Sequence, residues 1–133
     1  MKVRCIANSG KDLSKQALES GHLKTSEYQL IVGDVYTVYG ISLWNNVLNY
    51  LTMDKYGTLP FWHPAELFSV EESLLPLEWY YQYFGNGVDT CLSALWGYKE
   101  LVADENHYDE LLEREDTAIR IFLKRKREID EDS

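Results

Sequence analysis

The chain is short of the residue types that most often carry catalysis. Its 133 residues include two cysteines, three histidines and three prolines. Cys5 and Cys91 are too few for a disulfide framework, and both have apolar neighbours, so we expect two buried thiols. No apolar run approaches the ~18–20 residues that span a bilayer. The N-terminus lacks the apolar stretch of a secretory signal, so we expect a cytoplasmic protein.

The histidines and carboxylates do not form a catalytic or metal-binding pattern. His22 lies in a polar loop and His63 in a proline-bounded segment. His107 and Glu110 have the i, i+3 spacing of metal-binding helices, but such sites need carboxylates from further helices, so we expect a solvated helix face. Cys91 has no nucleophile signature around it. The glycines match neither a phosphate-binding loop nor the dinucleotide fingerprint. We expect no enzyme, no metal and no cofactor.

Negative charge is confined to the C-terminal half. The net charge is −9 at pH 7. Residues 1–70 carry six basic and six acidic residues, whereas residues 71–133 carry seven basic and sixteen acidic ones. This distribution disfavours nucleic acid and anionic membrane as partners, since both are negative, and favours a basic protein. We expect the run KRKR at 124–127 to lie in the last turns of a helix, where cations complement the helix dipole.

Residues 33–54 predict a β-hairpin with apolar side chains on both faces. The Asn-Asn pair at 45–46 suits the central positions of a type I′ turn, because asparagine tolerates positive φ. This centring pairs Trp44 with Val47. Gly40 leaves a gap on one face. We expect one face in the core of a sheet and the other against C-terminal helices. The first face carries Tyr39, Ile41, Leu43, Leu48 and Tyr50, and the second carries Tyr36, Val38, Trp44, Val47, Leu51 and Met53.

Residues 1–84 predict the mainly β half of an α+β chain. Residues 1–8 alternate as a strand, and Pro60 and Pro64 exclude a central strand between them. The segment after Pro64 predicts a helical turn or a short closing strand. Aromatic residues from Trp79 onward predict a strand-like edge. This order indicates an N-terminal antiparallel, SH3-like bent sheet or small barrel.

Residues 89–130 predict a mainly helical half, with about three C-terminal helices. The apolar spacing becomes helical in DTCLSALWGYKELV, with Asp89 or Thr90 as the N-cap. Asp104 opens a second helix, and Asp116 opens a third. We expect residues 1–133 to form one domain. The second helix should turn Tyr108, Leu111 and Leu112 inward, and the third should turn Ile119, Phe122, Leu123, Lys126 and Ile129 inward.

Carboxylates of the C-terminal half are candidates for binding a partner. Residues 71–118 carry twelve acidic residues against Lys99 and Arg114. A solubilising face would have this composition, and so would a docking face for a basic protein, with nearby aromatic side chains supplying the strongest contacts. The candidate partner-binding residues are Trp44, Glu71, Glu72, Asp104, Glu105, Asp109, Glu110 and Glu113.

The aromatic and glycine spacing resembles that of a set of short bacterial proteins. The segments concerned are GDVYTVYGISLW, LPFWHPAELFSV, the strand after Glu78 and ALWGYKELV. Some of those proteins are immunity proteins of contact-dependent growth inhibition and related polymorphic toxin systems. The resemblance implies a non-catalytic antitoxin that binds a cognate toxin domain, often a basic nuclease, and covers its active site. Its acidic face would then mimic substrate phosphates.

Other functions stay open at this level. An SH3-like regulatory module would bind a peptide or a subunit through its aromatic residues. A small cytosolic hydrolase or transferase would need a buried carboxylate or an activated Cys91. A homodimer also stays open, because an uncovered hairpin face can pair with a second copy.

Overall fold

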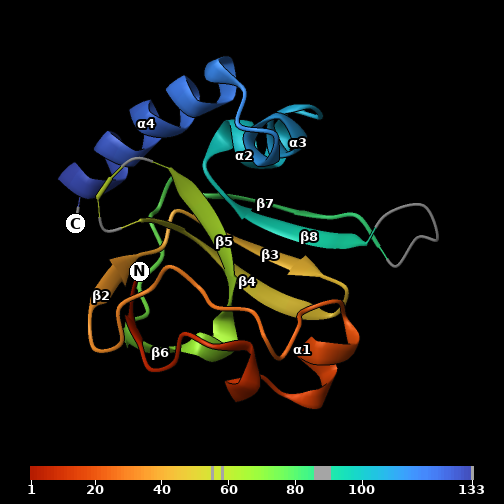
Figure 1. The fold of residues 1–133 in the computed structure, drawn as a ribbon. Helices are drawn as coiled ribbons and strands as arrows, with labels where there is room; N and C mark the ends of the chain where they lie inside the picture. Colours follow the sequence, from red (N-terminus) through yellow and green to blue (C-terminus); the bar gives the residue numbers. More distant parts are fainter. Residues whose placement is uncertain (55, 58, 86–90, 133) are drawn as a thin grey trace.

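The structure is a computed structural model, and it describes residues 1–54, 56–57, 59–85 and 91–132. The described residues form an α+β fold with two antiparallel sheets (Figure 1). One sheet has the order β2-β1-β6, from β1 (Lys2–Cys5), β2 (Val35–Thr37) and β6 (Phe68–Glu72). The other has the order β5-β4-β3-β8-β7, from β3 (Gly40–Trp44), β4 (Val47–Met53), β5 (Pro60–Pro64), β7 (Tyr80–Tyr83) and β8 (Leu92–Gly97). The α-helices are α1 (Lys15–Glu19), α2 (Lys99–Ala103), α3 (His107–Leu112) and α4 (Asp116–Glu131), and η1 (Gly10–Asp12) and η2 (Ala65–Leu67) are 3₁₀ turns.

The hairpin of β3 and β4 has the predicted turn and register. Asn45 and Asn46 have φ of 49° and 64°, and Trp44 is the Cα partner of Val47. Helix α1 holds this turn in place. The Asn45 side-chain amide donates a hydrogen bond to the Ser20 carbonyl at 3.0 Å, and Gln16 donates one to the Asn46 carbonyl at 3.0 Å.

The first arm of the predicted hairpin is divided between the two sheets. Its start forms β2, which pairs with β1, and only its end forms β3. Tyr39, at the junction, was expected on the same face as Tyr50 but packs against the C-terminal helices. Tyr36, Val38 and Val47, expected on the helix side, lie in the opposite core. The break at the junction removes the strict alternation on which the faces of Tyr36, Val38 and Tyr39 were assigned. Val47 lies beside the hairpin turn, outside this break, and the break does not explain its position.

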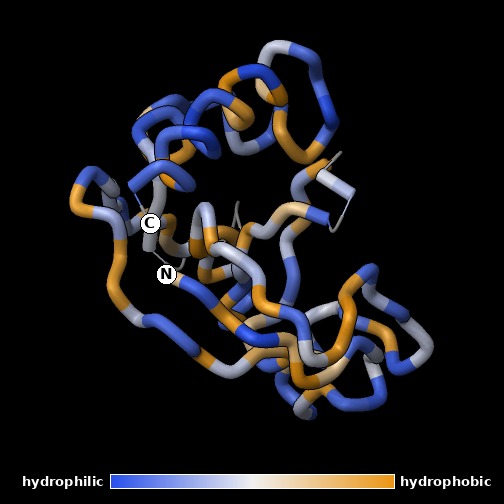
Figure 2. Tube along the Cα trace, turned by 90° about the vertical axis from the view of Figure 1, so that its left-hand side faces the viewer, coloured by the Kyte–Doolittle hydropathy of each residue, from blue (hydrophilic) through white to orange (hydrophobic). Residues whose placement is uncertain are grey.

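Two hydrophobic cores occupy the two sides of the five-stranded sheet, and both faces of the hairpin are therefore covered. The first core lies between this sheet and the three-stranded sheet, and the second lies under the C-terminal helices. Figure 2 shows these helices at the top of the molecule, with hydrophobic and hydrophilic residues alternating along them. The first core includes Val3, Cys5, Tyr50, Leu67 and Phe68, and the second includes Tyr39, Leu51, Leu95, Leu101 and Phe122.

The segment predicted as the first C-terminal helix is instead a strand. Residues Leu92–Gly97 form β8, which pairs with β3 on one side and β7 on the other. Three successive residues of β8, Ser93, Ala94 and Leu95, are buried, so both faces of the strand are covered. The apolar residues of such a strand need not alternate and can match a helical spacing by chance. Helix α2 begins only at Lys99. The expected N-cap at Asp89 or Thr90 lies outside the described residues.

The expectations for the prolines and for the segment after them are confirmed. Pro60 and Pro64 are the end residues of β5, which is an edge strand. The 3₁₀ turn η2 and the strand β6 follow Pro64. The described strands form two separate sheets and no closed barrel, so the expected small barrel is not confirmed.

Helices α3 and α4 turn the expected side toward the core, but fewer of the expected residues are buried. Leu111 and Phe122 are buried, whereas Leu112 and Leu123 are 51% and 37% exposed. Both exposed leucines follow a buried residue directly, and adjacent helical positions differ by about 100°. Helix α4 continues to Glu131, so its last turn has no basic residue and the run at 124–127 lies before it.

A pair of glycines lets α2 approach the sheet closely. Gly40 of β3 and Gly97 of β8 are Cα partners, and Leu101 of α2 lies over both. A Cβ atom on Gly40 would be 2.6 Å from Leu101 Cδ2, and one on Gly97 would be 2.7 Å from it. The gap that Gly40 leaves in the hairpin is therefore filled by a leucine from a later helix.

We expect Gly40→Ala to lower the free energy of unfolding by about 1–3 kcal/mol, because the added methyl group overpacks this contact. Urea denaturation measures the loss. In a Leu101→Ala background the same change should cost less, since the atom it meets is gone. An equal cost in both backgrounds would show that the contact is not the cause.

Candidate functional site

Seven carboxylates surround α3 on the outside of the molecule. We call this set the acidic surface. All of its members are exposed except Glu110, which is half-buried. The residues lie on α3, on the turns before and after it, and at the first position of α4. They are Asp104, Glu105, Asp109, Glu110, Glu113, Glu115 and Asp116.

The carboxylates of α3 point outward because the opposite face of the helix is buried. His107 and Leu111, four residues apart, are 1% and 2% exposed and therefore form the inner face of the helix. Asp109 and Glu113 fall on the opposite side. Asp104 Oδ1 accepts a hydrogen bond from the Asn106 backbone N–H at 2.9 Å, which shapes the turn into α3. Asp109 and Glu110 lie in the first turn of the helix, where negative charge complements the helix dipole.

The structure brings together five of the eight candidate partner-binding residues and separates the other three. Asp104, Glu105, Asp109, Glu110 and Glu113 belong to the acidic surface. Glu71 and Glu72 end β6, and Figure 1 shows β6 and α3 at opposite ends of the molecule. The Glu71 carboxylate also pairs with Arg4 at 2.5 Å. Trp44 is half-buried at the end of β3.

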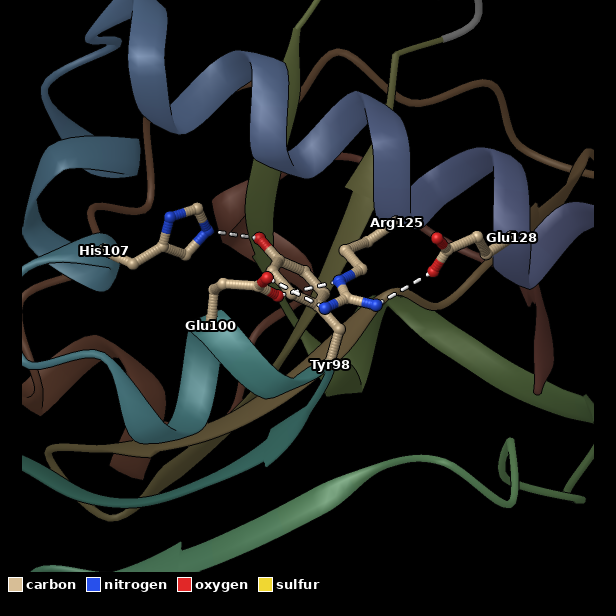
Figure 3. Close-up of polar contacts among 5 residues, drawn as sticks. All are labelled: Tyr98, Glu100, His107, Arg125 and Glu128. Atoms are coloured by element: carbon tan, nitrogen blue, oxygen red, sulfur yellow. Dashed lines mark hydrogen bonds and ion pairs between the residues drawn. The ribbon is translucent and has the colours of Figure 1, made fainter.

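A buried polar contact fixes the start of α3 to the sheet (Figure 3). The Tyr98 hydroxyl and His107 Nε2 are 2.6 Å apart. Both side chains are buried, at 3% and 1% exposure. The expectation of a solvated position for His107 is therefore wrong, because this histidine occupies the inner position one helical turn before Leu111. Burial lowers the pKa of His107, whereas the nearby Asp104 and Glu100 charges raise it. The effect of burial is the larger one, so the imidazole stays neutral near pH 7.

An ion-pair network ties α4 to α2 beside this contact. Arg125 donates two hydrogen bonds to Glu100, from Nε to Oε1 at 2.7 Å and from Nη2 to Oε2 at 2.8 Å. Its remaining nitrogen, Nη1, donates to Glu128 at 3.0 Å. The hydrogen bonds from Arg125 lower the pKa of Glu100. Such a two-point contact restricts the geometry of both helices, and the sequence did not indicate it because the partners are 25 residues apart.

A mixed cleft lies on another side of the molecule. It has a volume of about 900 Å³ and is bordered by the chain start, the segment 74–80 and the C-terminal part of α4. Leu74 and Leu77 in this segment are 72% and 100% exposed. Lysine, arginine, glutamate and aspartate side chains all line the cleft, so it has no dominant charge.

The described residues contain no group of three or more histidine, cysteine, aspartate or glutamate side chains placed to hold a metal ion. Within the same residues, no helix combines the length and the apolar character needed to cross a membrane.

Cys5 is buried, and burial raises the pKa of its thiol. Cys91 is exposed, contrary to expectation, because it precedes β8 and does not lie in a packed helix.

Comparison with known proteins does not assign the chain to a family. No family model matches it, no curated protein matches it, and no solved structure matches it. The resemblance to immunity proteins therefore stays a prediction, and a functional assignment depends on the acidic surface itself.

Proposed function

We propose that this chain is a non-catalytic, cytoplasmic immunity protein that binds and neutralises a cognate, basic, nuclease-type toxin domain through the acidic surface. The observation that carries the proposal is the exposure of nearly all of these carboxylates on one short helix, its flanking turns and the start of α4. The aromatic and glycine spacing of the sequence adds support.

The basic residue that lies among these carboxylates in the sequence is engaged elsewhere in the fold. Arg114 is the one basic residue between positions 104 and 116. Its guanidinium donates a hydrogen bond to the Pro60 carbonyl and lies 4.5 Å from the centre of the Phe61 ring. Arg114 thus fastens the end of α3 to β5. The surrounding carboxylates keep their negative potential toward solvent.

An acidic surface of this kind suits the inhibition of a nuclease. A nuclease needs a basic site to hold phosphates, and a patch of carboxylates is attracted to that site and can occupy it. The buried Tyr98–His107 contact and the Arg125–Glu100 pair hold α2, α3 and α4 in place. A surface that is fixed before binding loses less conformational entropy on association.

The proposal is tested by co-expressing the chain with the C-terminal domain encoded by the reading frame immediately upstream. We expect the two proteins to co-purify at low salt and the toxin activity to be blocked. Neutralising Asp109→Asn, Glu110→Gln and Glu113→Gln together should slow association by about tenfold at low salt, because charge attraction speeds encounter. The difference should shrink as salt screens the charges.

A matched control removes the same number of charges elsewhere. Asp12, Glu19 and Glu27 are exposed acidic residues of the N-terminal half. Their triple amide variant should associate at the wild-type rate. Failure of the wild-type pair to co-purify at low salt would overturn the proposal. Equal slowing by both triple variants would show that net charge acts and that the acidic surface has no special role.

A further inference from the structure

Strand β7 leaves one edge of the five-stranded sheet open. It is the last strand in the order β5-β4-β3-β8-β7 and pairs with β8 alone among the described strands. Its side chains are exposed on both faces of the sheet. Tyr80, Tyr81 and Tyr83 are 47%, 57% and 58% exposed, and the adjoining Phe84 is 41% exposed. An edge strand with free backbone groups and apolar side chains is a template for pairing with another strand.

This edge lacks the charged residues and prolines that commonly prevent such pairing. Residues 79–84 read WYYQYF and contain no charged residue and no proline. The opposite edge of the same sheet is protected, because β5 has a proline at each end and Arg114 binds the carbonyl of Pro60. Prolines and charges at an edge are the common means of blocking association. The difference between the β5 and β7 edges indicates that β7 pairs with a further strand.

The backbone of β7 is oriented for symmetric pairing. The Phe84 N–H donates a hydrogen bond to the Ser93 carbonyl of β8 at 2.6 Å. Peptide groups alternate in direction along a strand, so those of Tyr81 and Tyr83 point toward the open edge. A two-fold axis through Gln82 sets Tyr81 of one copy opposite Tyr83 of the other. Each such pair exchanges both backbone hydrogen bonds, and Tyr80 faces Phe84 of the second copy.

We propose that the chain forms a two-fold symmetric homodimer by antiparallel pairing of β7 with β7 of a second copy, in the register centred on Gln82. The occupant is a second copy because this register matches the strand to itself. Every cross-strand pair within residues 80–84 is then aromatic with aromatic, apart from Gln82 with its own equivalent. The Tyr81 ring is already supported by Trp96, with ring centres 5.0 Å apart.

The buried area predicts a dimer of modest affinity. An aromatic side chain offers roughly 200 Å², so four half-exposed rings on each copy bury about 800 Å² in total. The paired backbone adds to this, which places the contact near the lower end of specific interfaces, at ~1,200 Å². Each copy carries a charge of −9, and added salt should therefore strengthen the dimer by screening repulsion. Salt should weaken toxin binding, so the two proposals can fail independently.

Sedimentation velocity over a hundredfold range of protein concentration tests the proposal. We expect wild type to pass from monomer to dimer and Gln82→Lys to stay monomeric, with a dissociation constant raised at least about tenfold by two like charges face to face. Gln82→Glu should behave in the same way. An equimolar mixture of the two variants should form a heterodimer, because the opposite charges then meet across the axis.

The control is Gln29→Lys, which adds the same charge at an exposed position outside the sheet. It should dimerise like wild type, and thermal melts should show that all the variants are folded. A monomeric wild type across the whole range would overturn the proposal. If Gln82→Lys by itself dimerises like wild type, or if the mixture forms no heterodimer, the proposed β7 register is overturned.

Discussion

Phe122→Ala is expected to lower the free energy of unfolding by about 3–5 kcal/mol, a large part of the ~5–15 kcal/mol that stabilises a typical domain. Phe122 has no exposed surface. Its ring centre lies 5.6 Å from that of Tyr39 and 6.4 Å from that of Tyr98, both in edge-to-face geometry. The helix α4 that carries it covers the sheet, so the surrounding side chains cannot collapse fully into the space left behind.

Leu123→Ala is the matched control, because this neighbour in the same helix is 37% exposed. It should cost less than about 1.5 kcal/mol, since an exposed side chain leaves no cavity. Chemical denaturation with a comparison of m-values measures both changes. If the two substitutions cost the same, Phe122 does not have the central role in the core that its burial indicates.

Lowering the pH from 6.5 to 4 is expected to remove about 3 kcal/mol of stability through His63 alone. This side chain is 4% exposed and is surrounded by the rings of Tyr28, Phe61 and Phe68, at centre distances of 5.6, 5.9 and 6.4 Å. Burial among these rings lowers the pKa of His63 to about 4. The unfolded chain binds a proton at about pH 6.5, whereas the folded chain binds it only near pH 4.

The direction of the effect follows from this difference. Between pH 6.5 and 4 the unfolded state holds more protons, so stability rises with pH and falls on acidification. A gap of about 2.5 pH units at 1.36 kcal/mol each gives about 3 kcal/mol. Burial also lowers the pKa of His22 and His107, which adds acid sensitivity in the same direction.

His63→Phe should flatten this pH dependence, because it keeps a ring in the site and removes the titrating group. Urea midpoints measured at several pH values between 4 and 7.5 give the slope directly. His22→Gln serves as the comparison, since His22 is only half-buried. An unchanged slope in His63→Phe would mean that another group causes the acid sensitivity.

Features that depend on neighbouring residues could be predicted from the sequence. The hairpin register follows from two adjacent asparagines that tolerate positive φ, and the structure has that register. The edge position of β5 follows from its two prolines. The exposure of the carboxylates around α3 follows from the cost of burying an unpaired charge. In each case one short segment contains the physical cause.

Features that depend on distant partners could not be predicted. Strand β8 forms because β3 and β7 pair with its two edges and because residues distant in sequence cover both of its faces. Its own residues match a helix as well as a strand. His107 is buried and contacts Tyr98, whereas its polar neighbours in sequence indicate a surface position. Arg125 lies in a run of four basic residues, and nothing local distinguishes the one that binds Glu100.

The position of β3 between β4 and β8 has a consequence for synthesis on the ribosome. Strand β4 follows β3 after two residues, but β8 begins only at Leu92. In a nascent chain that has emerged only as far as β6, one hydrogen-bonding edge of β3 is therefore unpaired and accessible to other strands. Non-local pairing of this kind folds slowly and leaves unpaired edges open to aggregation. The C-terminal residues are thus needed to pair the second edge of β3 as well as to present the acidic surface, and a chain released early would lack both.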